Sequence, residues 1–200
     1  LTNGANTAAA EGGILVNGSD VYILGYETNA SGKAVATYWK NGIAYPLHDS
    51  TNSIGSALAL FVDGDDVYVG GQVKPGIGLA GVPVAKYWKN GVGVSLTDGT
   101  RHACIYGLFV KNNDVYAVGS ESSGFGGRSV ALYWKNGSVN WLTDGTQNAT
   151  ATSVFVKDND VFIAGGEDDF YLNAVYWKNG LVQPLQLTAP ITRSKFVVVQ

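Results

Sequence analysis

The chain has little of what most catalytic and metal sites need. Its 200 residues include one cysteine, Cys104, two histidines and no methionine. A single cysteine excludes a disulfide within the chain, and two histidines exclude any site that requires several of them. The missing methionine indicates a mature product or an excised segment, whose initiator was removed with an upstream part.

Charge is also scarce, because Asp, Glu, Lys and Arg make up only 14% of the chain. Soluble proteins usually carry roughly 25%. The net charge is −3 and the 13 basic residues are scattered. Nucleic acids are bound through clustered Lys and Arg, so we expect no nucleic-acid partner. No apolar run approaches the roughly 20 residues that span a bilayer, so we expect no direct membrane insertion.

What the chain does have is glycine, at 27 residues, and a hydrophobic content of 46%. This content is enough to bury a sizeable core in one domain. The many Gly, Asn, Ser and Thr residues indicate an all-β protein with many turns. Because the composition is polar but poor in charge, it favours a secreted or cell-surface protein.

Two motifs recur along the chain with nearly constant spacing. The sequence Tyr-Trp-Lys-Asn-Gly begins at Tyr38, Tyr87, Tyr133 and Tyr176. The sequence Asp-Val-Tyr/Phe begins at Asp20, Asp66, Asp114 and Asp160, so its copies are 46, 48 and 46 residues apart. Such a period predicts tandem copies of one structural unit of about 47 residues.

Each unit is predicted to contain four short antiparallel strands, A to D. Strand A ends in an aromatic-Val or Leu-Val pair, and a tight polar turn leads to strand B. We expect strand B to be closed by a glycine and to cover residues 21–24, 67–70, 115–118 and 161–164. Strand C ends in Tyr-Trp-Lys, and Asn-Gly then supplies a two-residue hairpin turn before strand D. Four such strands in fewer than 50 residues are typical of one blade of a β-propeller.

The predicted fold class is therefore an all-β propeller in a single domain, residues 1–200. Its repeats cover about 8–52, 53–99, 100–146 and 147–190, and residues 191–200 form an extra inner strand. Residues 1–4 match the end of a strand D and residues 194–197 match a strand A, so they are read as split fragments of a fifth unit. Either four blades close the ring or the array continues with more units.

The burial pattern supports stacked blades. Strand B is apolar at both parities, as in Val115 to Val118, which predicts cover on both faces. Strand A carries small residues such as Ala57 and Ala149, as expected where the inner strands of a propeller lie close together around the ring axis. We expect the four repeated tryptophans to be core residues between neighbouring sheets rather than a platform for ligands.

At the Tyr-Trp-Lys-Asn-Gly and Asp-Val-Tyr motifs the chain resembles the YWKNG-type propeller repeats of bacterial secreted proteins and lipoproteins. The resemblance covers nearly the whole chain and implies the fold and a surface location, but no activity. Tachylectin-type lectins have a similar repeat length, which raises sugar binding as an alternative. Hemopexin-type propellers share a Tyr-Trp in strand C, but their Asp-Ala-Ala motif is missing here.

The variable part of the repeat predicts where a partner binds. Turns A–B and C–D are short and uniform, whereas the distance from the repeated Asp to the following Trp is 19, 22, 20 and 17 residues. Loops on a rigid scaffold commonly carry binding residues. We therefore expect the B–C and D–A loops to form the binding face. The candidate ligand-binding residues are Tyr26, Glu27, Glu121, Phe125, Arg128, Glu167, Asp168, Phe170 and Tyr171.

Three of these candidates, Glu27, Glu121 and Glu167, occupy one position, two residues past the strand-B glycine. Carboxylates there could bind a cation or sugar hydroxyls, or could simply pair with a nearby lysine. The acidic run from Asp63 to Asp66 matches no EF-hand loop and is explained by turn chemistry, so no metal or other cofactor is expected.

Catalysis is poorly supported by the sequence. His102 and Cys104 could pair as base and nucleophile, but Cys104 falls in strand A, where a small buried residue is expected. We therefore expect no enzyme. The sequence predicts a non-enzymatic interaction or scaffold module, with a protein partner, and as the alternative a lectin-like module that binds surface glycans.

Overall fold

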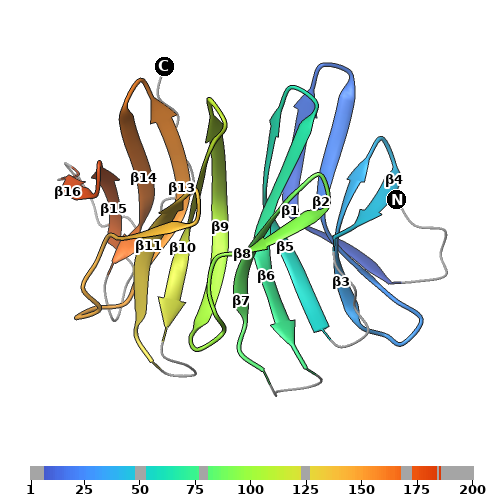
Figure 1. Ribbon diagram of the computed structural model, residues 1–200, viewed down its shortest axis with the longest axis horizontal. Helices are drawn as coiled ribbons and strands as arrows, with labels where there is room; N and C mark the ends of the chain where they lie inside the picture. The colour runs from blue at the N-terminus through green and yellow to red at the C-terminus, as the bar shows by residue number, and fades with distance from the viewer. Residues whose placement is uncertain are drawn as a thin grey trace. The chain divides into compact units, whose positions relative to one another are not determined.

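The described part of the protein consists of β-strands and turns (Figure 1). In the computed structural model, residues 7–47, 53–76, 81–122, 127–167, 173–183 and 185 are described. The expected fifth-unit fragments, residues 1–4 and 191–200, lie outside these ranges. None of the described segments forms a helix with the length and apolar character that crossing a membrane requires.

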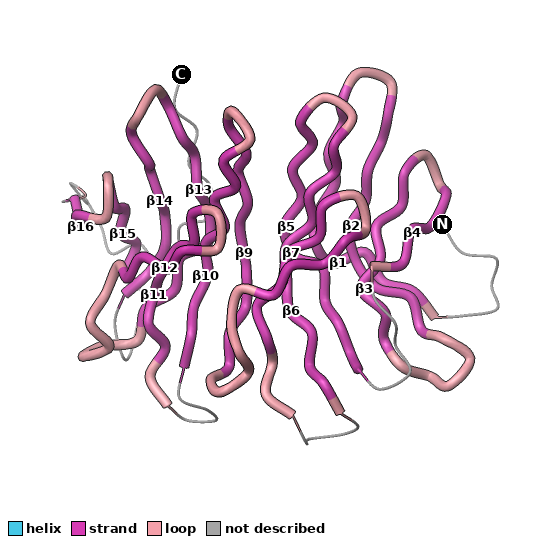
Figure 2. The backbone as a smooth tube through the Cα atoms, viewed as in Figure 1, coloured by secondary structure: helices cyan, strands magenta, loops and turns pink. Residues whose placement is uncertain are grey.

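Sixteen strands in these ranges form four sheets of four antiparallel strands (Figure 2). Sheet 1 contains β1 (Ala8–Asn17), β2 (Asp20–Thr28), β3 (Ala34–Lys40) and β4 (Ile43–Pro46). Sheet 2 contains β5 (Ser53–Asp63), β6 (Asp66–Pro75), β7 (Val84–Lys89) and β8 (Val92–Ser95). Sheet 3 contains β9 (His102–Lys111), β10 (Asp114–Ser122), β11 (Ser129–Lys135) and β12 (Ser138–Trp141). Sheet 4 contains β13 (Ala149–Lys157), β14 (Asp160–Glu167), β15 (Asn173–Lys178) and β16 (Leu181–Gln183).

In every sheet the strands follow one another in sequence order, which confirms the predicted all-β units of four antiparallel strands. The chain forms two compact units, Leu1–Ile105 and Tyr106–Gln200. Sheets 1 and 2 lie in the first unit. Sheet 4 and most of sheet 3 lie in the second, and the first residues of β9 belong to the first unit.

The Asn-Gly turns have the predicted hairpin geometry. Asn41, Asn90, Asn136 and Asn179 have φ of 51°, 50°, 51° and 53°, and each following glycine also has a positive φ. Asparagine and glycine tolerate this left-handed region best. The repeated motif therefore ends in Asn-Gly because the two-residue link between strands C and D requires it.

The four repeated tryptophans are buried, as predicted. Trp39, Trp88, Trp134 and Trp177 are each 1% exposed. Trp88 belongs to a core cluster with Tyr22 and Leu24 of sheet 1. Trp177 belongs to one with Tyr116 and Val118 of sheet 3. Neighbouring sheets within each unit therefore pack through the aromatic residues of the repeat.

One prediction about strand B was wrong, because its glycine does not end the strand. Strands β2, β6, β10 and β14 continue for two to four residues past Gly25, Gly71, Gly119 and Gly165. The glycine instead faces a β-bulge in strand A: the β5–β6 register shifts between Ala57 and Ala59, opposite Gly71. A Cβ at residue 71 would lie 1.9 Å from the Ser56 carbonyl oxygen. Only glycine allows the bulged backbone to approach this closely.

One apolar face of sheet 1 is open. Ile14 and Val16 on β1 are 68% and 63% exposed, whereas their equivalents on β13, Val154 and Val156, are 6% and 5% exposed. Val154 and Val156 are buried in the cluster that contains Tyr116 and Val118 of sheet 3. The same strand-A face is thus covered where another sheet packs against it.

Candidate functional site

The two ends of each sheet differ in chemistry. The A–B and C–D turns lie at one end, here called the turn end. The B–C and D–A connections lie at the other, here called the loop end. Strand B starts at the turn end with the repeated Asp and finishes at the loop end with the candidate carboxylates.

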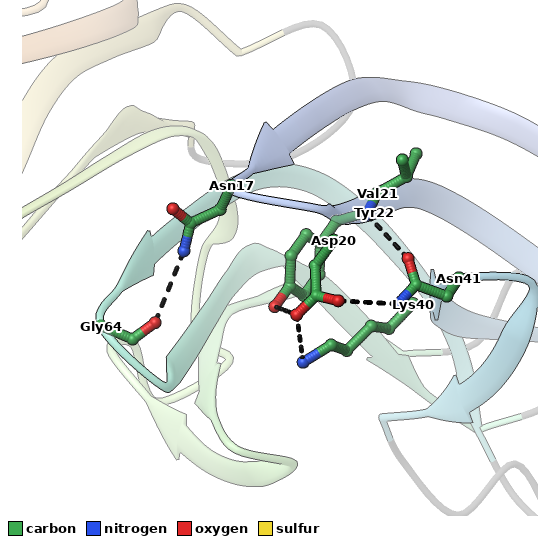
Figure 3. A network of polar contacts seen from close by, with 7 residues as sticks. All are labelled: Asn17, Asp20, Val21, Tyr22, Lys40, Asn41 and Gly64. Atoms are coloured by element: carbon green, nitrogen blue, oxygen red, sulfur yellow. Dashed lines mark hydrogen bonds and ion pairs between the residues drawn. The ribbon is translucent and has the colours of Figure 1, made fainter.

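At the turn end, three repeated residues form one hydrogen-bonded group, here called the clasp (Figure 3). In sheet 1 the clasp consists of Asp20, Lys40 and Asn41. Lys40 Nζ lies 2.8 Å from Asp20 Oδ2. Asn41 Nδ2 donates to Asp20 Oδ1 at 2.7 Å. The Val21 amide donates to Asn41 Oδ1 at 2.9 Å, so the clasp ties the start of strand B to the C–D turn.

The clasp occurs in all four sheets with nearly the same geometry. The Asp–Lys distances in sheets 2, 3 and 4 are 2.7, 2.9 and 2.6 Å. The Asn Nδ2 to Asp Oδ1 distance is 2.7 Å in each of them. In each sheet the lysine ammonium also lies 5.1 to 5.3 Å from the ring centroid of the strand-B aromatic residue. The repeated Asp, Lys and Asn of the two motifs are therefore explained by one structural contact.

The clasp shifts the pKa of its charged groups. Hydrogen bonds from Lys89 and Asn90 hold the pKa of Asp66 below its ordinary value. The corresponding bonds lower the pKa of Asp20, Asp114 and Asp160. The bond from Asp66 raises the pKa of Lys89. These charges already have partners within the fold, so they are poor candidates for a catalytic role.

A further repeated sequence, Leu-Thr-Asp-Gly at Leu96 and Leu142, also forms contacts within the fold. The Ala85 amide donates to Thr97 Oγ1 at 3.1 Å, and Asp98 Oδ1 accepts from the Thr100 amide at 2.9 Å. Thr143, Asp144 and Thr146 make the same contacts in sheet 3. Hydrogen bonds from Thr100 and Thr146 lower the pKa of Asp98 and Asp144. The threonine and aspartate side chains of this part of the D–A connection are thus used in local hydrogen bonds.

The candidate carboxylates lie at equivalent positions of strand B. Glu27, Glu121 and Glu167 pair across the sheet with Val35, Val130 and Asn173, each four residues before the buried tryptophan. All three are half-buried. They were expected in loops, but they lie inside β2, β10 and β14, because strand B continues past its glycine.

The three carboxylates are divided between the two units. Glu27 belongs to the first unit, and Glu121 and Glu167 belong to the second. Among the described residues, no three His, Cys, Asp or Glu side chains lie close enough to hold a metal ion. The acidic run from Asp63 to Asp66 is also divided between structural elements. Asp63 ends β5, Gly64 and Asp65 form the turn, and Asp66 belongs to the clasp of sheet 2.

The remaining candidates divide into described and undescribed residues. Tyr26 lies half-buried on β2, and Arg128 is exposed just before β11. Phe125, Asp168, Phe170 and Tyr171 lie outside the described residues. The β2–β3 connection is described: Asn29 Oδ1 accepts from the Ser31 and Lys33 amides, each at 3.0 Å.

Cys104 is a buried residue of β9, as predicted, with 7% exposure. Its Sγ lies 3.6 Å from the Ile105 carbonyl oxygen. His102 is the first residue of the same strand and is half-buried. A buried thiol is poorly placed to attack a substrate from solution.

Sequence reasoning missed the clasp as a single site. The two motifs that build it were found separately, one at the end of strand C with its hairpin turn and the other at the start of strand B. Their shared period was the signal that could have joined them. Residues 18 to 24 positions apart pair when a strand B and the end of the following strand C lie side by side.

No family model and no curated protein matches this chain. Among solved structures, it is similar to the crystal structure of a GH43_12 retrieved from capybara gut metagenome, with 16% identity and a TM-score of 0.39. The match covers 94% of this chain and 43% of that one, so this chain spans less than half of its length. This likeness is too distant to carry over an activity or a site.

Proposed function

We propose that this protein is a non-enzymatic interaction module of the YWKNG-repeat type, secreted or on the cell surface. Its four sheets are blades of a β-propeller, and a protein partner binds at the loop end. One observation carries the proposal. The residues that recur in every unit are occupied by the clasp and the core, while the loop end differs from unit to unit.

The two ends of strand B differ in how far their residues recur from sheet to sheet. At its start, Asp and Val recur in every sheet, and the Asp binds the same two partners each time. At its end, the position of Glu27 holds Val73 in sheet 2, and the preceding residue changes from Tyr26 to Gln72, Ser120 and Gly166. Fold requirements explain the repeated end. The varied end is where a rigid scaffold is free to carry recognition.

The open face of sheet 1 supports the propeller. Ile14 and Val16 have the same apolar character as the equivalent residues that are buried in sheet 4. Exposed apolar faces of this kind mark interaction sites. In the proposal, a further sheet of the same repeat covers this face.

The proposal is tested once a partner has been isolated with the full chain. A loop-end variant, E27Q/E121Q/E167Q with R128A, changes four described candidates at positions outside the core clusters and the clasp. We expect it to weaken the complex at least tenfold, as measured by calorimetry. The control is a turn-end variant, D65S, which is expected to bind like the unchanged protein. Equal affinity of both variants would refute the proposed face.

The non-enzymatic part has its own test. The purified chain is screened against ester, peptide and glycoside substrates, and we expect no turnover above the buffer rate. Turnover that any one of the Glu27, Glu121 or Glu167 to Gln substitutions removes would overturn this part of the proposal.

A further inference from the structure

A polar pocket lies at the turn end of the second unit, where sheets 3 and 4 meet. It has a volume of about 270 Å³ and is lined by residues from the A–B turns of both sheets and from the sheet-3 clasp. The pocket is on the opposite end from the proposed partner face, so the two can be tested separately.

One wall of the pocket is held rigidly by the clasp. Lys135 Nζ lies 2.9 Å from Asp114 Oδ2, and Asn136 Nδ2 donates to Asp114 Oδ1 at 2.7 Å. The same ammonium lies 5.2 Å from the centroid of the Tyr116 ring. A wall whose side chains already have fixed partners is preorganised for a ligand.

The other wall has unused hydrogen-bonding capacity. Within the described part of the chain, the side-chain amides of Asn112 and Asn159 make no hydrogen bond, although both line the pocket. Lys111 Nζ donates to the Asp158 carbonyl oxygen at 3.0 Å, which uses one of its three N–H groups. The pocket therefore offers amide donors and acceptors together with further ammonium donors.

The charges that line the pocket balance. Lys111 and Lys135 are cationic, and Asp114 and Asp158 are anionic. A phosphate or sulfate would meet two carboxylates, which disfavours it. A neutral ligand with several hydroxyl groups suits the pocket better, because each hydroxyl both donates and accepts a hydrogen bond. We infer that the pocket between sheets 3 and 4 binds a neutral sugar residue of a glycan.

The corresponding place in the first unit lacks these side chains. Gly18 in sheet 1 and Asp65 in sheet 2 occupy the positions of Asn112 and Asn159, and Asn17 replaces Lys111. Asn17 Nδ2 lies 3.5 Å from the Gly64 carbonyl oxygen (Figure 3), as Lys111 Nζ lies near Asp158. The contact between turns is thus kept in both units, while the two amides belong to the second unit alone.

This comparison supplies the variant for the test. The substitution N112G/N159S removes both amides: the first unit has Gly18 at the position of residue 112, and Ser19 in the β1–β2 turn shows that the third turn position accepts serine. Glycine also tolerates the φ of 51° at residue 112. The control variant, D65S, makes a similar change in the turn of sheet 2, outside the pocket.

Binding is measured on the full chain by ¹⁵N-edited NMR, with the methyl glycosides of glucose, galactose, mannose and N-acetylglucosamine as probes. We expect at least one of them to shift the backbone amides of residues 111, 112 and 159. We also expect N112G/N159S to weaken that glycoside at least tenfold, with D65S unchanged and both variants retaining dispersed spectra.

Three results would overturn the inference. The first is that none of the four glycosides shifts the pocket amides. The second is that N112G/N159S binds the glycoside as well as the unchanged chain does. The third is that inorganic phosphate, tested alongside, binds at these amides more tightly than any of the four glycosides.

Discussion

The bulge glycine of strand B is the position where the fold should tolerate a small change least. In sheet 2, a methyl group at residue 71 would lie 1.9 Å from the Ser56 carbonyl oxygen and 3.3 Å from the Ala57 Cα. Both contacts are with backbone, which cannot move aside as a flexible side chain does. Real Cβ atoms essentially never approach within 3.0 Å, so β5 would have to move by more than an ångström. That movement breaks the strand pairing around the bulge.

We therefore expect Gly71→Ala to lower the free energy of unfolding by about 2 to 3 kcal/mol, the range for a forced backbone shift in a packed region. The opposing gain from a stiffer unfolded chain is only about 0.4–1 kcal/mol. For a chain of this size the loss corresponds to a decrease in Tm of roughly 4–12 °C. The measurement is urea unfolding followed by far-UV circular dichroism, with a thermal scan beside it.

The matched control is Gly64→Ala in the turn of the same sheet. Gly64 has a φ of +58°, and nothing lies within 4 Å of its added Cβ. Its alanine variant loses only the left-handed backbone preference, about 1 kcal/mol. If Gly71→Ala unfolds at the same urea concentration as Gly64→Ala, or at a higher one, the bulge argument is wrong.

Three further outcomes follow from the same structure. The pKa is lowered in the fold for Asp20, Asp66, Asp114 and Asp160, so the native state binds fewer protons than the unfolded chain. The stability that these carboxylates contribute is present above their ordinary pKa of 3.8. It is lost as the pH falls through the lowered pKa. Urea midpoints should therefore fall between pH 5 and pH 2, and Asp66→Asn should reduce that slope; an unchanged slope in the variant would contradict the clasp. Trp88→Phe should destabilise the fold by about 1–3 kcal/mol through lost core volume, whereas Trp141→Phe, at a side chain that is 51% exposed, should change it by less than about 0.5 kcal/mol and remove most acrylamide quenching of the fluorescence. The Cys104 thiol should react with a thiol reagent only after unfolding, since it is 7% exposed; rapid reaction of the folded chain would show that β9 is open.

The sequence predicted the repeat unit well, because a period of about 47 residues carries several constraints at once. Asn-Gly specified the C–D hairpin, and the apolar pattern of strand B specified cover on both faces. Both follow from local geometry, and both were confirmed. The burial of the four repeated tryptophans was predicted on the same grounds.

The prediction of where strand B ends was wrong because glycine is common both in turns and opposite β-bulges. Gly71 was read as the end of a strand, because glycine is depleted in strands and common in turns. The bulge that requires it lies in β5, in another part of the sequence, so no local pattern reveals it. This error placed Glu27, Glu121 and Glu167 in loops instead of strands.

The candidate binding residues were the least predictable part. Their choice rested on loop variability, which indicates freedom from fold constraints but not a ligand. The polar pocket depends on Lys111 of β9 and on the turn between β13 and β14, two segments brought together only by sheet packing. Such a meeting cannot be derived from the period of the repeat.

The clasp assigns the repeated residues to the fold and leaves the loop end for recognition. Amide hydrogen exchange tests it directly at Val21, Val67, Val115 and Val161, whose N–H groups donate to asparagine side chains at 2.8 to 2.9 Å. We predict slow exchange at all four, and Asn90→Gly, which keeps the turn conformation, should accelerate Val67 and leave Val115 unchanged. Fast exchange at these valines in the unchanged protein, or no response of Val67 to Asn90→Gly, would contradict the account.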